Sequence, residues 1–153
     1  MKSCKMQVRK IQEKDWRACW QIQRSDHPHD EPFSADTWLF ICKNLTDSFV
    51  VVDEHDVPVG YWLGILKINP HEEIPDIWCL AIDVCTHRDY REAGVMDLIM
   101  PVATEYHQRI YAFTQKDNQP AEGIMTKWGF EKGWYSEEHD MYYWTYERED
   151  NVS

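Results

Sequence analysis

The sequence predicts one α/β domain over residues 1–153, built on a mixed, mainly antiparallel central sheet of about seven strands with helices on both faces. Three observations lead to this prediction. Segments whose apolar residues alternate with period two are interleaved with segments of helical period. Tight turns between neighbouring strands favour antiparallel pairing. The chain also lacks an internal repeat or a low-complexity linker, so a single core suffices for its length.

Periodicity and capping residues place the elements in order along the chain. The predicted strands span residues 6–11, 48–53, 57–68, 77–86, 109–115, 130–134 and 141–147. Helical spacing predicts a helix that begins near Asp15, a candidate cap, and a second that Ser34 caps. Two further helices are expected over residues 91–106 and 118–127.

Three details within these elements carry structural expectations. Residues 77–86 are nearly all apolar, which predicts a central strand covered on both faces. Gly60 and Gly64 weaken the preceding strand and mark a bulge or a close approach of another backbone. Pro101 cannot donate a backbone hydrogen bond, so we expect it to kink or break its helix.

Composition restricts the classes of function. Sixteen basic and 27 acidic residues give a net charge of −11, which argues against nucleic-acid binding and favours a basic or amine-bearing partner. Five scattered cysteines without a Cys-x-x-Cys pair indicate neither a disulfide framework nor a zinc ribbon. Without a signal sequence or an apolar stretch of membrane-spanning length, we expect a cytoplasmic protein that does not bind membranes. The charged tail over residues 148–153 is expected to fray.

The most informative stretch runs from Asp83 to Met100. A predicted strand leads into a polar turn and then into a helix whose first turn carries Gly94. The unpaired N–H groups and the dipole at such a helix start suit a phosphate, and Arg88 and Arg91 can reach the same place. The alternative is an ordinary connection from strand to helix with solvated charges.

Two local matches, in the right order and on the right elements, give the chain a family resemblance. The run Arg91-Glu92-Ala93-Gly94-Val95-Met96 resembles the pyrophosphate loop Q/R-x-x-G-x-G/A of the GNAT (GCN5-related N-acetyltransferase) superfamily. Residues 118–121 (Asn-Gln-Pro-Ala) and 127–131 (Lys-Trp-Gly-Phe-Glu) resemble the later signature of that family. The order of the elements is similar over nearly the whole length, so the chain looks like a divergent GNAT member.

The resemblance implies acetyl-coenzyme A as co-substrate. In the family, the strand matching residues 77–86 splays from the strand matching residues 109–115, and the pantetheine arm bonds to strand backbone between them. The pyrophosphate would then rest on the loop that follows. The implied cofactor-binding residues are Val84, Cys85, Thr86, Arg91, Glu92, Ala93, Gly94, Val95, Met96 and Asn118.

The chain departs from the family pattern where catalytic groups are usual. Leu80 and Ile82 occupy positions that often carry a general base, and Met125 stands where many members have a proton-donating tyrosine. Met96 replaces a small residue at the end of the pyrophosphate loop. Activity therefore depends on groups other than the usual ones, with water as one possible carrier of the amine proton.

Asp83 and Tyr111 are the candidate catalytic residues. Asp83 is the only acid between residues 77 and 86, so we expect either a general base or a hydrogen-bonded structural carboxylate. Strand alternation places it on the face opposite Leu80 and Ile82 unless a bulge intervenes. Tyr111 is either a proton donor from the neighbouring strand or a core residue.

The acceptor is expected to be a primary amine of a small molecule or a protein. His29, Asp30 and Glu31 lie in a loop that shapes the acceptor pocket in the family, so they either hold a cationic amine or are simply solvated. The residue types there offer no second ligand group, so no metal site is expected. The aromatic last strands allow a homodimer.

These features support two hypotheses of function. The first is an N-acyltransferase, most simply an acetyltransferase, that works by direct attack of the amine on the thioester. The second is a GNAT-fold protein that has lost transfer chemistry and serves as a binding or structural module. Binding of acetyl-coenzyme A, followed by turnover, separates the two.

Overall fold

The computed structural model describes residues 5–26 and 32–149, to which all statements below refer. Its strands are β1 (Gln7–Lys10), β2 (Phe49–Val52), β3 (Pro58–Asn69), β4 (Asp76–Thr86), β5 (Arg109–Gln115), β6 (Glu131–Ser136) and β7 (Met141–Glu147). Its helices are α1 (Trp16–Asp26), α2 (Ala35–Asn44), α3 (Val95–Tyr106) and α4 (Gln119–Lys127), with short 3₁₀ helices η1 (Glu13–Asp15) and η2 (Arg88–Tyr90).

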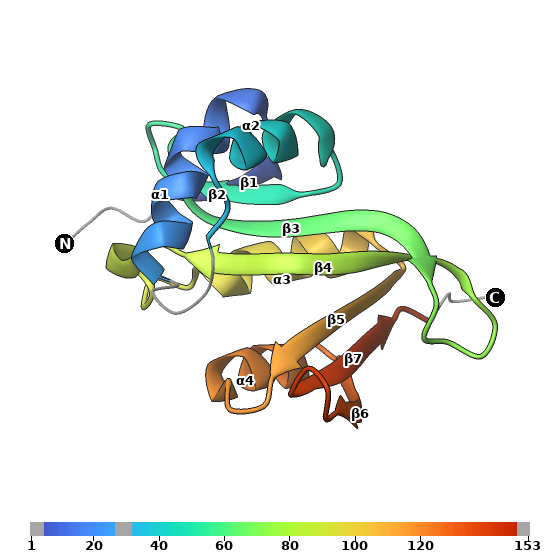
Figure 1. Ribbon diagram of the computed structural model, residues 1–153. Helices are drawn as coiled ribbons and strands as arrows, with labels where there is room; N and C mark the ends of the chain where they lie inside the picture. Colours follow the sequence, from blue (N-terminus) through green and yellow to red (C-terminus); the bar gives the residue numbers. More distant parts are fainter. Residues whose placement is uncertain (1–4, 27–31, 150–153) are drawn as a thin grey trace.

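The seven strands form one sheet in the spatial order β1-β2-β3-β4-β5-β7-β6 (Figure 1). Neighbouring strands are antiparallel except β4 and β5, which are parallel. The predicted mixed, mainly antiparallel α/β sheet is therefore confirmed.

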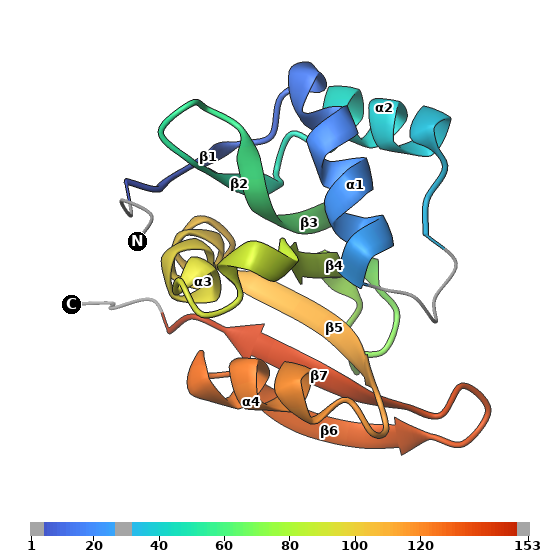
Figure 2. The ribbon, with the colours of Figure 1, turned by 90° about the vertical axis from the view of Figure 1, so that its left-hand side faces the viewer.

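Helices cover both faces of the sheet, as Figure 2 shows. On one face, α1 and α2 pack on alternate residues of β2 and β3, including Val50, Tyr61 and Leu63. On the other face, α3 packs on the intervening residues, including Val51 and Trp62, and α4 adds Met125 to the same apolar cluster. The period-two pattern read from the sequence therefore divides the core into two layers.

Strand β4 is less covered than its apolar composition predicted. Ile77 is 58% exposed and Ile82 is 39% exposed, although Trp78 and Cys79 are buried. Helices on the two faces pack on only part of this long strand: Ile77 lies at its start, and Ile82 lines the cavity beside β5. The expectation of a strand buried on both faces was therefore wrong at these two positions.

Helix α3 begins at Val95, four residues later than predicted. Gly94 is its N-cap, with a left-handed φ of 80°, and Arg91 to Ala93 form the turn before it. Pro101 does not end the helix, which continues to Tyr106. Proline removes one intrahelical hydrogen bond, and the turns on either side of it keep theirs.

The helix starts differ in how they are capped. Ser34 accepts a hydrogen bond from the Thr37 N–H, as expected of the cap of α2. Asp15 instead ends η1, where its buried carboxylate accepts from the Gln12 N–H at 2.7 Å and pairs with Arg9 at 2.8 Å. Asp15 thus fixes the turn before α1 through residues that precede it in the chain.

The end of the described chain is held to the sheet as far as Arg148. Its N–H donates to the Gln108 carbonyl at 2.9 Å, directly after β7. Residues 150–153 lie outside the described part, so the fraying of residues 148–153 stays a prediction.

Gly60 lets the start of α3 lie directly on β3. A Cβ at this position would stand 2.4 Å from Cγ1 of Val95 and 3.3 Å from the Cys85 carbonyl oxygen. The register also shifts between Leu63 and Gly64 opposite β4. Gly60 therefore provides the close approach that the sequence predicted, and Gly64 lies opposite a bulge in the neighbouring strand β4.

We expect Gly60→Ala to destabilise the protein by about 1–3 kcal/mol in urea unfolding, because the added methyl overlaps Val95. The matched control is Gly123→Ala in α4, where a Cβ meets nothing within 4 Å, and which should stabilise by about 0.5–1 kcal/mol. Combined with Val95→Ala, the Gly60 change should cost less than the sum of the single changes. Strict additivity would contradict this explanation.

Candidate active site

Strands β4 and β5 are paired over only two positions. Cys79 lies opposite Ile110 and Leu80 opposite Tyr111, and beyond these pairs the strands diverge, as Figures 1 and 2 show. After Leu80, β4 is therefore not paired with β5. Buried backbone groups need a hydrogen-bonding partner, so an opening of this kind favours water or a ligand between the strands.

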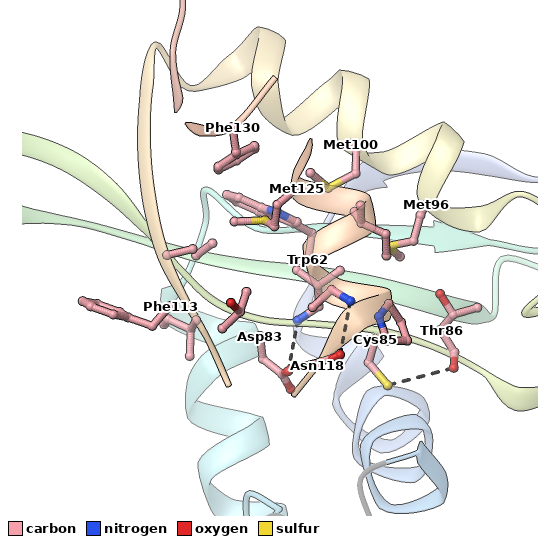
Figure 3. A pocket seen from close by; sticks show the side chains of 18 of the residues that line it. Trp62, Asp83, Cys85, Thr86, Met96, Met100, Phe113, Asn118, Met125 and Phe130 are labelled. Carbon is pink, nitrogen blue, oxygen red and sulfur yellow. Dashed lines mark hydrogen bonds between the residues drawn. The ribbon is translucent and has the colours of Figure 1, made fainter. Parts of the chain in front are cut away.

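A cavity of about 790 Å³ occupies this opening. Its walls come from β3, β4, β5, α3, α4 and the turns between them. It is lined by Trp62, Ala81, Ile82, Asp83, Val84, Cys85, Thr86, Arg91, Met96, Met100, Ala112, Phe113, Thr114, Gln115, Asn118, Pro120, Ala121, Ile124, Met125 and Phe130. Figure 3 shows Met100, Met125 and Phe130 grouped on one side of the cavity and Asp83 and Cys85 on another.

Arg91, in the turn before α3, and Met96, in the first turn of the helix, both line the cavity wall. A Cβ on Gly94 would meet nothing within 4 Å, so the surface at this helix start is open. The first N–H groups of a helix have no intrahelical partner, and together with Arg91 they make the place electropositive. The geometry suits a phosphate group.

Four members of the predicted loop are not among the residues that line the cavity: Glu92, Ala93, Gly94 and Val95. The Val95 side chain is buried in the core, so only its backbone is available. The Ala93 N–H already donates to the Tyr90 carbonyl at 3.0 Å. Any phosphate contact by these residues therefore comes from backbone groups other than the Ala93 N–H.

Asn118 is the N-cap of α4 and lines the cavity on the side of β5. Its Oδ1 accepts a hydrogen bond from the Ala121 N–H at 3.2 Å. Val84, Cys85 and Thr86 line the cavity on the side of β4. The structure thus brings together the predicted strand segment, Arg91, Met96 and Asn118 around one cavity.

Asp83 reaches the α1 face of the sheet because of a bulge in β4. It lies opposite Leu63, whereas Ala81 lies opposite Gly64, so Ile82 is the extra residue. Leu80 lies opposite Ile65, two residues from Leu63 on the same face of β3, so the bulge puts Asp83 and Leu80 on one face. Simple alternation, which placed them on opposite faces, is wrong here.

Three hydrogen bonds hold the Asp83 carboxylate. Oδ2 accepts from the Tyr61 hydroxyl at 2.6 Å and from Nε2 of Gln23 at 3.0 Å, and Oδ1 accepts from the Val84 N–H at 3.0 Å. Burial, with the nearby Asp83 charge, raises the pKa of Tyr61 far above its usual range, so this phenol remains a donor. Sequence reasoning missed Gln23 and Tyr61, because only the fold brings them to Asp83.

Tyr111 lies away from the cavity. It is 2% exposed and packs with Trp78 and Tyr143, and burial raises the pKa of its hydroxyl. It points to the face of β5 opposite Ala112, which does line the cavity. The core-residue alternative from the sequence analysis therefore describes Tyr111 better than proton donation into the cavity.

Cys85 lines the cavity as a thiol. Burial, with the charge of Asp83, raises its pKa to about 12. The nucleophilic form of cysteine is the thiolate, which is scarce at neutral pH when the pKa is so high. The site therefore lacks an activated thiol at Cys85, which bears on whether an acyl group could be carried covalently there.

His29, Asp30 and Glu31 lie outside the described residues. Within residues 5–26 and 32–149, no group of three or more His, Cys, Asp or Glu side chains could hold a metal ion. None of the helices in this described part has the length and apolar character needed to cross a membrane.

Comparison with known proteins identifies the family. Residues 6–130 match the model of the acetyltransferase (GNAT) family. The chain belongs to this family. The resemblance found in the two short motifs therefore extends over most of the GNAT domain. No curated protein matches the sequence significantly.

Solved structures share the fold at low identity. Diaminobutyrate acetyltransferase EctA from Paenibacillus lautus, in complex with diaminobutyric acid and coenzyme A, gives a TM-score of 0.72 at 13% identity, covering 94% of this chain and 95% of that one. Arabidopsis thaliana NAA60 with acetyl-CoA gives 0.70 at 16%, covering 92% and 98%. Ard1 from Thermoplasma volcanium gives 0.69 at 15%, covering 95% and 99%. At these identities the likeness shows the shared GNAT fold.

The environment of Cys85 predicts low thiol reactivity. At pH 7.5 we expect iodoacetamide to label Cys85 of the folded protein at least about a hundredfold more slowly than in urea, because burial suppresses the thiolate. Site-resolved mass spectrometry measures both rates. Cys79, buried outside the cavity lining with a pKa also raised to about 12, is the internal control. Labelling of Cys85 at its unfolded rate, with Cys79 still protected, would contradict the assignment.

Proposed function

We propose that this GNAT protein is an N-acyltransferase that moves an acyl group, most simply acetyl, from acyl-coenzyme A to a primary amine of a small molecule or protein. The observation that carries the proposal is the cavity between the diverging strands β4 and β5, with the start of α3 at its wall. A cytoplasmic location belongs to the same proposal.

The residues around the cavity fit coenzyme A. In the proposal, backbone groups of Val84 to Thr86 bind the pantetheine arm, because β4 has no strand partner on that side. Arg91 and the backbone around Gly94 and Met96 hold the pyrophosphate, which suits the open helix start. Asn118 contacts the arm from α4.

Acetyl-coenzyme A, when bound, supplies the acyl group as a thioester. The acceptor nitrogen attacks its carbonyl carbon, a C–N bond forms, the C–S bond breaks, and the sulfur leaves as thiolate. Asp83 receives the proton that the amine must lose. The raised pKa of Cys85 favours this direct route over an acyl-enzyme, because the side chain remains a thiol.

Met125 lines the cavity where a proton donor to the leaving thiolate is common in the family. Its thioether has no proton to give. No tyrosine occurs among the described residues that line the cavity. The proposal therefore relies on the thiolate as a leaving group that departs without help from a tyrosine, and on placement of the two substrates.

The acceptor class remains open within this proposal. The net charge of −11 favours cationic amines, and His29, Asp30 and Glu31 stay predicted acceptor residues. The structural neighbours suggest a screening panel, since NAA60 has been solved with a bisubstrate analogue and EctA with diaminobutyric acid. Short peptides with free N-termini and small diamines are therefore the first acceptors to test. A homodimer through the last strands also stays a prediction.

The alternative is a GNAT-fold protein without transfer activity. Leu80, Ile82 and Met125, which stand at positions that often carry catalytic groups, favour this alternative. It predicts either no cofactor binding or binding without turnover. The two experiments below separate these cases.

Acetyl-coenzyme A should raise the thermal midpoint by several degrees at a hundredfold excess over its dissociation constant, because such an excess stabilises by about 2.7 kcal/mol. Acetyl-pantetheine, which lacks the pyrophosphate, should give no shift at the same concentration. With Arg91→Ala, about ten times more acetyl-coenzyme A should be needed to give the same thermal shift. Arg17→Ala, which changes an exposed residue of α1, should not alter the concentration needed. Equal shifts with both thioesters would refute the pyrophosphate site.

Asp83→Asn should lower kcat for acetyl transfer by roughly a hundredfold, because the amide cannot take the amine proton. The thermal shift with acetyl-coenzyme A should be unchanged. Asp97→Asn, which removes only an exposed ion pair with Lys127, should keep wild-type kcat. If the Asp83 variant turns over at the wild-type rate, the carboxylate is structural and the amine proton goes to water.

A further inference from the structure

We propose that Gln23 is a positioning residue for the transfer reaction. In this inference, which rests on the proposed function, Gln23 fixes the Asp83 carboxylate beside the cavity and ties it to the segment that leads into α2. One amide side chain then sets the placement of the base relative to the helices on the acceptor side. Nothing in the sequence motifs points to this residue.

Every polar atom of the Gln23 side chain is engaged. Nε2 donates to Oδ2 of Asp83 at 3.0 Å, and Oε1 accepts from the Phe33 N–H at 2.8 Å and from Nε1 of Trp38 at 2.9 Å. The side chain is 4% exposed. The Phe33 N–H and the Trp38 Nε1–H can only donate, so they face the amide oxygen, and the Asp83 carboxylate can only accept, so it faces the amide nitrogen. These partners therefore determine the orientation of the Gln23 amide.

These contacts close a ring between the helix layer and the sheet. Gln23 joins Trp38 of α2 to Asp83 of β4. The Trp38 ring meets the Tyr61 ring edge-on at 4.9 Å, and the Tyr61 hydroxyl returns to Asp83 at 2.6 Å. Among these residues, Gln23 is the one from α1 that donates a hydrogen bond to the Asp83 carboxylate.

The arrangement restricts Asp83 to one orientation. Gln23 and Tyr61 both donate to Oδ2, so rotation of the carboxylate would break two hydrogen bonds at once. The other carboxylate oxygen of Asp83, Oδ1, accepts a hydrogen bond from the Val84 N–H at 3.0 Å. A side chain needed only to fill the contact of α1 with the sheet could be apolar, as Ile22 is. The amide instead serves the carboxylate that lines the cavity.

The sharpest test is Gln23→Glu, which keeps size and keeps an oxygen for Phe33 and Trp38 but replaces the donor that faces Asp83. We expect kcat to fall about tenfold or more, equivalent to about 1.4 kcal/mol, while the KM for acetyl-coenzyme A and its thermal shift stay at wild-type values. The matched control is Gln21→Glu, which adds the same charge at an exposed position of the same helix and should leave kcat unchanged.

A double variant tests whether Gln23 acts through Asp83. In the Asp83→Asn background, Gln23→Glu should have little further effect on kcat, because the group it positions is already inactive. An independent tenfold loss in that background, or a Gln23→Glu protein with wild-type kcat, overturns the inference. A wild-type protein that transfers acetyl to no acceptor refutes the proposed function itself, and the inference with it.

Should Gln23→Glu fail to fold, Trp38→Phe tests the same arrangement. It keeps an aromatic ring against Tyr61 and removes the Nε1 donor that holds Oε1 of Gln23, together with part of the buried ring volume. We expect about a threefold lower kcat with an unchanged KM for acetyl-coenzyme A. Wild-type kcat in a folded Trp38→Phe protein would overturn the positioning role.

Discussion

The parting of β4 from β5 is the constraint on which the rest of the structure depends. On either side of it the sheet is continuously paired, through β1 to β4 and through β5, β7 and β6. The two parts meet at only two residue pairs. The chain leaves β4 toward α3 and leaves β5 toward α4, so both helix starts contribute to the cavity. The part of β4 that does not pair with β5 and the starts of two helices thus come together because of one topological feature.

The two faces of this opening have different chemistry, and a single extra residue separates them. Toward α3 and α4 the wall is apolar, with Trp62, Met100 and Phe130. The bulge at Ile82 then turns Asp83 toward α1, where Gln23 meets it. A strand without that bulge would direct the carboxylate into the apolar layer, where an ionised group is costly. The bulge in β4 therefore keeps the Asp83 carboxylate away from the apolar wall of the same cavity.

Period-two and helical patterns were enough to predict every strand and the four long helices, because each element buries one face. Boundaries failed where local backbone decided them, as at Gly94, whose left-handed conformation delays α3. The loop around Gly94 and Asn118 could be singled out because their motifs are local in sequence, and their binding of coenzyme A stays a prediction. The face occupied by Asp83 stayed open between two alternatives, since a bulge has no periodic signal, and Gln23 was missed, since its partner lies 60 residues away.

In the proposed reaction, the placement of the two substrates contributes more to catalysis than proton donation to the leaving thiolate does. Met125 has no proton to give, and the pKa of about 12 keeps Cys85 from acting as a nucleophile. What remains is a carboxylate that accepts from donors of both the sheet and α1 and lines the cavity proposed to hold the thioester. Correct placement of reacting groups alone can supply several kcal/mol of the barrier, about 7–11 kcal/mol in the best cases. In such a site, the groups that fix geometry matter as much as those that exchange protons.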